Sequence, residues 1–175
     1  EDKKIITNFS NIISKNSIVG VSGASGTGKT TLIYLLAGVL KPKSGRILCN
    51  DIDINELENW LDKISYVSQK PFIIDGTIKE NICLGDEETN ENEAYLEKIY
   101  NQSGLVEFIE SLPQKDKTNV GDSGNLISGG QIQRIGIARA LFKKSEVILL
   151  DEITSNLDTD TENKIIKNLS LIKKD

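Results

Sequence analysis

The 175-residue sequence contains no histidine and no methionine, and only 5% of its residues are aromatic. No apolar run approaches the roughly 18 residues that a membrane-spanning helix needs, and no charged leader followed by an apolar stretch suggests a signal peptide. The two cysteines, Cys49 and Cys83, lack the spacing of a metal site and sit beside apolar residues. We interpret both as small buried side chains rather than a disulfide, which favours a reducing compartment. Because the chain does not begin with methionine, we expect it to be a domain excised from a longer protein.

The composition is that of an ordinary globular domain. Hydrophobic residues make up 38% of the chain and charged residues 27%, and this length suffices for one domain with a sizeable core. The net charge of -5 argues against a nucleic-acid partner, which would call for a basic face. No internal repeat or low-complexity segment is present.

Hydrophobic patterning predicts an α/β fold with a helical insertion. The run 147–150 is wholly apolar, as in a central parallel strand buried on both faces. Between 75 and 114 acidic and amide residues become frequent, while apolar residues recur at helical spacing over 91–109. We therefore expect a small helical insertion there and a loop over 115–125. The expected strands are 18–21, 46–50, 64–68 and 147–150, and the expected helices are 29–40, 129–142 and 159–171.

A glycine-rich segment, Gly23–Thr30, reads GASGTGKT and fits the phosphate-loop pattern G-x-x-x-x-G-K-[ST]. Its glycines let backbone N–H groups turn inward as an anion-binding nest, and the following helix adds its positive N-terminal end. Lys29 should neutralise the β- and γ-phosphates, and the Thr30 hydroxyl should ligate Mg²⁺. The alternative is a chance glycine-rich turn, which the expected flanking strand and helix disfavour. The predicted nucleotide-binding residues of this loop are Gly23, Ser25, Gly26, Thr27, Gly28, Lys29, Thr30 and Thr31.

Two carboxylates, Asp151 and Glu152, follow the apolar run and so lie at the carboxyl end of a buried strand, where ligands bind in open α/β sheets. Asp151 would hold Mg²⁺ through water as a hard oxygen ligand. Glu152 points elsewhere, and a carboxylate there can act as a general base toward the attacking water. Alone, the pair could equally be an acidic cap on a strand; the phosphate loop upstream favours the nucleotide role.

A second anion site is predicted at Ser128-Gly129-Gly130, which opens the helix expected over 129–142. Small residues at a helix start expose unpaired N–H groups and the positive end of the helix dipole. The simpler interpretation is an N-cap serine followed by two flexible glycines, and without the neighbouring motifs it would be preferred.

The ordered set of motifs resembles the ATP-binding cassette (ABC) family. Over 126–158, ISGGQ continues into IQRIGIARAL and is followed by VILLDE, similar to the family's signature region. Gln69 stands at the Q-loop position, and 155–158 resembles the D-loop. The resemblance covers essentially the whole chain and implies a P-loop NTPase (RecA-like) core with a mainly parallel sheet plus the ABC helical subdomain. Within a single domain, 1–175, it places the core in 1–74 and 125–175 and the helical subdomain in 75–124.

The resemblance also implies an ATPase that uses ATP and Mg²⁺. Glu152, Gln69 and Lys29 take the catalytic positions, and Mg²⁺ would be bound by Thr30, Gln69 and Asp151. The family's signature segment closes over ATP held by another subunit, so two ABC domains, identical or different, would pack head to tail. The residues expected at the partner's ATP are Ser128, Gly129, Gly130, Gln131 and Asp158.

The sequence departs from the family pattern in a few places. Ile127 takes the place of the usual leucine of the signature, which is a conservative change. The family's switch histidine is expected beyond Asp175, and its adenine-stacking aromatic residue before Glu1. We therefore expect a chain truncated at both ends, with weak or no hydrolysis by these 175 residues alone.

Two segments, 75–82 and 118–124, resemble exporter domains, although each alone could be an ordinary surface loop. The resemblance then implies a transmembrane domain fused before this one, and a location on the cytoplasmic face of the cell membrane, a bacterial inner membrane. Phe72, Ile73 and Ile74 follow the Q-loop; they could pack in the core or form a groove for the membrane domain's cytoplasmic helices. We expect at least one of them to be exposed.

Two other functions remain in competition with transport. A non-transport ABC ATPase acting on DNA or ribosomes is disfavoured by the short insertion, the single cassette and the acidic balance. A regulatory, non-hydrolysing cassette is disfavoured by the presence of Glu152.

Overall fold

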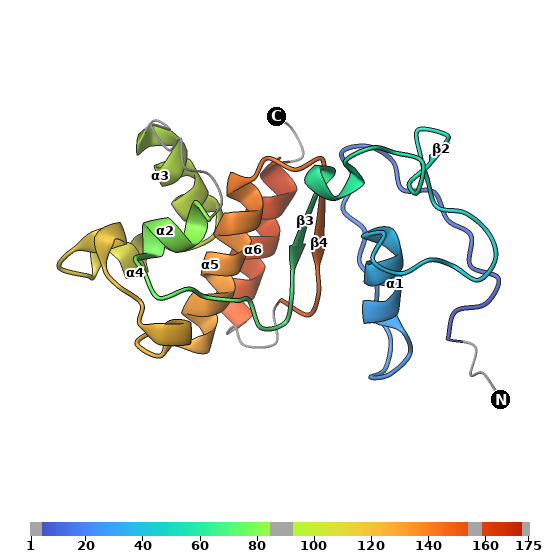
Figure 1. Ribbon diagram of the computed structural model, residues 1–175. Coiled ribbons are helices and arrows are strands. Elements are labelled where there is room, and N and C mark those ends of the chain that lie inside the picture. The colour runs from blue at the N-terminus through green and yellow to red at the C-terminus, as the bar shows by residue number, and fades with distance from the viewer. Residues whose placement is uncertain (1–4, 85–92, 154–158, 173–175) are drawn as a thin grey trace.

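The computed structural model describes residues 5–84, 93–153 and 159–172. Several helices lie between the strands β3 (Ile64–Val67) and β4 (Val147–Leu150) in the sequence, and Figure 1 shows helices on both sides of this central pair of strands. The α-helices are α1 (Lys29–Leu36), α2 (Ile78–Ile82), α3 (Glu93–Gln102), α4 (Val106–Glu110), α5 (Gly129–Phe142) and α6 (Thr159–Ile172). The other strands are β1 (Leu48–Cys49) and β2 (Ile52–Asp53), and short 3-10 helices span Trp60–Lys63, Lys115–Lys117 and Asp122–Gly124.

The central pair, β3 and β4, is parallel, with Ile64 opposite Val147 and Val67 opposite Leu150. Because side chains alternate along a strand, the two faces of the pair belong to different layers. Val67 joins the large core on the α5 side, whereas Ile64 packs with Ala37, just past the end of α1. In Figure 1, α5 and α6 lie on one side of the two strands and α1 lies on the other.

The main core is built around α5, which is buried along most of its length. Ile135, Ile137 and Ala138 of this helix are almost fully inaccessible. They belong to the same cluster as Ile165 of α6 and as buried side chains from the helices at the left of Figure 1, namely Ile78, Ile82, Leu96, Ile99 and Ile109. The helical region thereby forms one continuous apolar core with the signature helix.

Most predicted elements are present, and α5 has the predicted bounds. The helix predicted over 29–40 ends at Leu36, because Gly38 adopts a φ of 74° and the N–H groups of Ala37 and Gly38 bond back to the last turn. The strand predicted over 46–50 is reduced to β1, which pairs with β2 as an antiparallel hairpin. The loop predicted over 115–125 contains two of the 3-10 helices.

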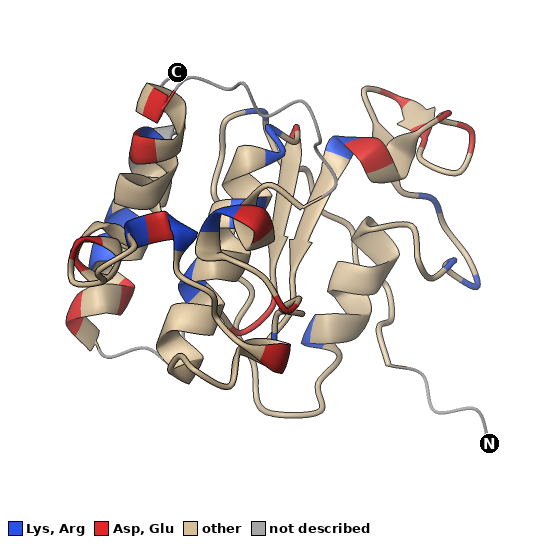
Figure 2. Cartoon of the chain, turned by 60° about the vertical axis from the view of Figure 1, so that its left-hand side comes forward, with Lys and Arg blue, Asp and Glu red and all other residues tan. Residues whose placement is uncertain are grey.

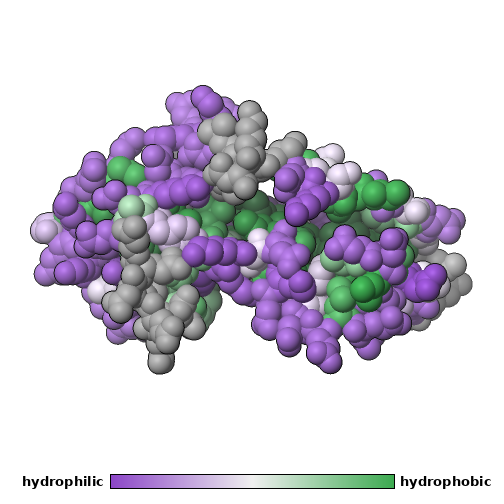
Figure 3. Space-filling model, turned by 90° about the horizontal axis from the view of Figure 1, so that it is seen from above, coloured by the Kyte–Doolittle hydropathy of each residue, from purple (hydrophilic) through white to green (hydrophobic). Residues whose placement is uncertain are grey.

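The strand predicted over 18–21 is wrong for this structure. Ile18, Val19 and Val21 are about half exposed, and the segment forms no ladder with any described strand. A run of β-branched residues favours extended backbone, but a strand needs a partner strand to supply its hydrogen bonds. Most apolar side chains of 5–21 are exposed, including those of Ile5, Phe9, Ile12 and Ile13. Figure 3 shows hydrophobic surface on the right-hand side of the molecule, where the N-terminal half lies.

The α/β fold class is confirmed, with one parallel pair and one antiparallel hairpin in the described part. None of the described helices is long and apolar enough to cross a membrane. The predicted domain division at 74/75 and 124/125 stays a prediction.

Candidate nucleotide-binding site

The phosphate loop leads directly into α1, and its backbone geometry depends on glycine. Gly26 and Gly28 have φ values of 78° and 100°, in the left-handed region that other residues rarely adopt. A Cβ atom at Gly28 would also lie 2.5 Å from the Ile5 side chain. No side chain caps α1 at Gly28, so the N–H groups of its first turn are available to an anion.

The Lys29 ammonium lies across this loop and reaches the end of β4. Its Nζ donates to the carbonyl oxygens of Gly23 (3.0 Å) and Ala24 (3.2 Å). It also lies 3.5 Å from Glu152 Oε1, whose side chain is about half exposed. An ion pair with such solvent access is weak, so a phosphate group can displace it.

Thr30 and Asp151 meet between α1 and the end of β4. Thr30 Oγ1 donates to Asp151 Oδ1 at 3.3 Å, and Asp151 is only 6% exposed. The Asp151 backbone N–H donates to the Val67 carbonyl at 2.9 Å, which continues the β3–β4 ladder. A hydroxyl and a carboxylate are the hard oxygen ligands that Mg²⁺ prefers, so the donor set fits the metal. No cluster of three or more acidic or cysteine ligands occurs in the described residues.

Gln69 completes the group from the loop after β3. Its Nε2 donates to Glu152 Oε2 at 3.3 Å, which leaves its amide oxygen free of that bond. Glu152 has a φ of 49°, a conformation that is costly for a residue other than glycine and is frequent at functional sites. The predicted catalytic and metal-binding residues Lys29, Thr30, Gln69, Asp151 and Glu152 thus lie together at one edge of the β3–β4 pair.

One residue of this site was missed by sequence reasoning. The Tyr66 hydroxyl donates to Asp151 Oδ2 at 3.3 Å. Although Tyr66 is 39% exposed, partial burial of its hydroxyl, a hydrogen bond with Tyr34 and the nearby Asp151 charge raise the pKa of the phenol, so it remains a proton donor. The sequence signal that could have identified Tyr66 is the alternation of side chains along β3, which places Tyr66 on the same face as Ile64, toward α1.

The signature residues form a separate site at the start of α5. Ser128 Oγ accepts from the Gln131 N–H (3.3 Å), and the Ser128 N–H donates to Gln131 Oε1 (2.7 Å), forming a capping box. The N-cap alternative is therefore realised in the structure. In this capping bond the Ser128 hydroxyl acts as an acceptor, so its O–H proton remains available for donation to another group. Ser128 and Gly129 are exposed, so an external anion can approach them.

The two predicted anion sites do not meet in one chain. Among the described residues, no hydrogen bond joins 128–131 to the phosphate loop. Of the other predicted residues, Thr27 Oγ1 donates to the Ala24 carbonyl within the loop at 2.8 Å, and Thr31 lies in α1. Asp158 and the predicted D-loop over 155–158 lie outside the described residues.

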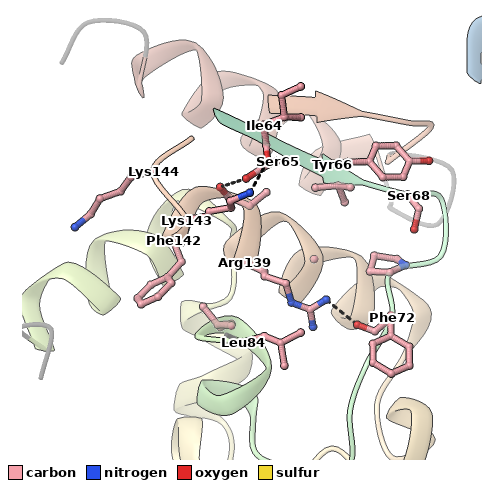
Figure 4. Close-up of a pocket in the computed structure, with 15 residues that line it drawn as sticks. Ile64, Ser65, Tyr66, Ser68, Phe72, Leu84, Arg139, Phe142, Lys143 and Lys144 are labelled. Carbon is pink, nitrogen blue, oxygen red and sulfur yellow. Dashed lines mark hydrogen bonds between the residues drawn. The ribbon is translucent and has the colours of Figure 1, made fainter. Parts of the chain in front are cut away.

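A cavity of about 590 Å³ lies between β3, the end of α2 and α5 (Figure 4). Its wall includes Phe72, Leu84 and Phe142. Phe72 is 70% exposed and Ile73 only 4%, so the expectation that at least one residue after the Q-loop is exposed is confirmed. Arg139 Nη1 donates to the Phe72 carbonyl at 2.8 Å, and burial lowers the pKa of this guanidinium.

The fold and the site together define a P-loop ATPase. Comparison with known proteins identifies the family within this class. Residues 6–155 match the family model described as ABC transporter. The chain is 40% identical over 160 residues to the colicin V secretion/processing ATP-binding protein CvaB of Escherichia coli, covering 89% of this chain and 23% of that protein. It is 34% identical over 171 residues to the mycobactin import ATP-binding/permease protein IrtB of Mycolicibacterium thermoresistibile, covering 97% and 29%.

A solved structure, described as a bacterial Atm1-family ABC exporter with ATP bound, superposes with a TM-score of 0.78 at 34% identity, covering 86% of this chain and 26% of that one. The chain belongs to the ABC transporter family, and it matches the ATP-binding part of these transporters. The predicted family and P-loop NTPase fold are confirmed. The chain spans less than a third of the length of the curated relatives it matches.

Proposed function

We propose that this chain is the motor domain of a membrane exporter, in which ATP hydrolysis drives the passage of a substrate through an attached membrane domain. The observation that carries the proposal is the meeting of Lys29, Thr30, Gln69, Asp151 and Glu152 at one edge of β3 and β4. These groups supply the parts that phosphoryl transfer needs: a cation for the phosphates, oxygen ligands for a metal and a base for water.

Each of these side chains has a distinct role in the proposed reaction. Lys29 exchanges its contact with Glu152 for the β- and γ-phosphates, and the phosphate loop holds those phosphates through its N–H groups. Glu152, released from Lys29, accepts a proton from the attacking water, which the Gln69 amide orients. Thr30, Asp151 and Gln69 would hold Mg²⁺, which when bound neutralises charge on the phosphoryl oxygens.

The second anion site is proposed to serve a second ABC domain, identical or different. Ser128, Gly129, Gly130 and Gln131 are exposed or partly exposed at the N-terminus of α5, where an external phosphate would gain N–H donors and the helix dipole. Asp158 is proposed to contribute to the same interface. Two domains packed head to tail would complete each site with residues of both chains.

The membrane partner is proposed to precede this domain in the same protein and to dock at the cavity beside Phe72. Phe72 is exposed and lines this cavity, and aromatic side chains are enriched at protein interfaces. The domain would then lie on the cytoplasmic face of the cell membrane, which we propose to be a bacterial inner membrane. The names of the relatives, which are those of transporters, favour this function over a DNA- or ribosome-associated one.

Export rather than import rests on segments 75–82 and 118–124, since one relative is named for secretion and another for import. A nucleic-acid partner is not part of the proposal. Acidic and basic residues are interspersed over the helices in Figure 2 rather than gathered as a basic face, and the net charge is -5.

The proposal is tested by Lys29→Ala in the full-length protein, reconstituted in lipid vesicles. Mg²⁺-dependent ATP hydrolysis should fall by about 10²–10³-fold because the cation that stabilises the phosphate charge is lost. Lys70→Ala, which removes an exposed lysine next to Gln69, is the matched control and should retain full activity. Hydrolysis at the normal rate by Lys29→Ala would show that this loop is not the catalytic phosphate site.

A further inference from the structure

The carboxylate of Asp151 is held by two hydroxyl groups from different parts of the fold. Thr30, in α1, donates to Oδ1 at 3.3 Å. Tyr66, in β3, donates to Oδ2 at 3.3 Å. With its backbone N–H bonded to Val67, Asp151 is fixed at the main chain and at both carboxylate oxygens.

Tyr66 is itself well placed to hold a fixed position. Its ring packs edge-on against the ring of Tyr34, with centroids 5.9 Å apart and planes at 72°, in a favourable aromatic geometry. Tyr34 belongs to α1, the helix that also carries Lys29 and Thr30. The phenol is therefore anchored between the strand before the Q-loop and the helix after the phosphate loop.

We propose that Tyr66 is a positioning residue for the metal site, whose hydroxyl fixes the rotation of the Asp151 carboxylate so that Oδ1 faces Thr30 and Mg²⁺. This inference rests on the proposed function. A carboxylate bonded through Oδ2 cannot turn that oxygen toward the metal without breaking the bond. Without the hydroxyl, the buried carboxylate loses a donor and gains rotational freedom. Hydrogen-bond partners behind metal ligands typically change metal affinity about 10–100-fold when removed.

A purely structural role would have a different signature. If the hydroxyl only stabilised the fold, its removal would lower the melting temperature and leave metal affinity unchanged. If it positions Asp151, metal affinity falls while nucleotide affinity without metal stays the same, because the phosphate loop does not contact Tyr66 by any hydrogen bond in the described residues.

The test is Tyr66→Phe in the full-length protein, with Mn²⁺ as a paramagnetic probe. Electron paramagnetic resonance titrations measure Mn²⁺ binding in the presence of saturating ADP, and ADP binding is measured separately in EDTA. We expect Mn²⁺ affinity to fall about tenfold and ADP affinity in EDTA to remain within twofold of wild type. Tyr100→Phe is the matched control, because it also removes a tyrosine–aspartate hydrogen bond (Tyr100 to Asp116, 3.0 Å) but lies in the helical region.

Each outcome decides the matter. Mn²⁺ affinity within twofold of wild type in Tyr66→Phe overturns the inference, as does an equal loss in Tyr100→Phe. If Tyr66→Phe does not fold, Tyr66→Met removes the hydroxyl with the ring, and its Mn²⁺ affinity must fall at least as far. Absence of ADP-dependent Mn²⁺ binding in the wild-type protein would instead contradict the proposed function itself.

Discussion

At the scale of single residues, Lys29 and Glu152 form an ion pair, with Lys29 Nζ 3.5 Å from Glu152 Oε1. The same Glu152 carboxylate accepts a hydrogen bond from Gln69 through its other oxygen. The proposed base is thus shared between Lys29, the proposed phosphate-binding group, and Gln69, the group proposed to orient water. In the proposed reaction, nucleotide binding and activation of the base are linked through the Glu152 side chain.

Glu152→Gln should separate ATP binding from hydrolysis. The amide keeps the shape of the side chain but cannot take a proton, so hydrolysis should fall about 10²–10⁴-fold, and ATP should remain bound after free nucleotide is removed. Retained radiolabelled ATP and phosphate release, both on the full-length protein, measure the two effects. The control variant Glu146→Gln, which alters an exposed carboxylate paired with Lys63, should hydrolyse ATP at the wild-type rate. Wild-type turnover by Glu152→Gln would show that Glu152 is not the base.

The sequence predicted most residues of the site but not all of their contacts. Lys29, Thr30, Asp151 and Glu152 were found because each lies in a short motif whose spacing is set by local backbone geometry. Tyr66 was missed because its contact with Asp151 depends on the register between β3 and β4, strands that lie far apart in the sequence. Register is decided by packing of the whole sheet face.

At the scale of elements, two helices begin with the same device. Ser128 with Gln131 and Thr77 with Glu80 each form a complete capping box, at the starts of α5 and α2 respectively. The α5 box begins the signature helix, whereas the α2 box lies in the segment after the Q-loop. Comparing them separates the structural role of a cap from the proposed role of Ser128 in binding a partner's phosphate.

Ser128→Ala and Thr77→Ala should have similar effects on stability and different effects on hydrolysis. Each removes an N-cap acceptor and should cost about 1 kcal/mol of unfolding free energy, measured by denaturant unfolding. Only Ser128→Ala should also lower ATP hydrolysis, by about tenfold to hundredfold, because a hydrogen bond to a charged phosphate is lost. Equal rates of ATP hydrolysis by the two variants would show that Ser128 acts only as a helix cap and does not bind a phosphate.

The same comparison of elements shows where sequence patterns succeed. The bounds of α5 were predicted correctly because a capping residue, small residues and a long helix-forming run all agree. The strand over 18–21 was not formed, since its apolar composition says nothing about which strand would lie beside it. Elements with local start signals are predictable, and elements that exist only through pairing are less so.

At the scale of the whole molecule, the two anion sites belong to helices on opposite sides of the β3–β4 pair (Figure 1). The phosphate loop precedes α1, and the signature residues begin α5. Among the described residues, no hydrogen bond joins the signature residues 128–131 to the phosphate loop. The central claim is therefore that a complete site is built from two chains.

A dimer that combines two inactive variants of the full-length protein tests this claim directly. Lys29→Ala damages the phosphate loop, and Ser128→Arg blocks the signature while leaving the phosphate loop intact. In a head-to-tail dimer, a mixed pair contains one site with neither change and one site with both. Each variant alone should be inactive, whereas equal co-expression should restore hydrolysis to about a quarter of the wild-type rate, since half the dimers are mixed and half their sites are intact.

The measurement is ATP hydrolysis by mixed dimers isolated through two different affinity tags, one on each variant. The account predicts that these purified mixed dimers hydrolyse ATP at about half the wild-type rate per dimer. A mixed dimer as inactive as its parents would contradict it, because a site contained within one chain carries its own defect in every pairing.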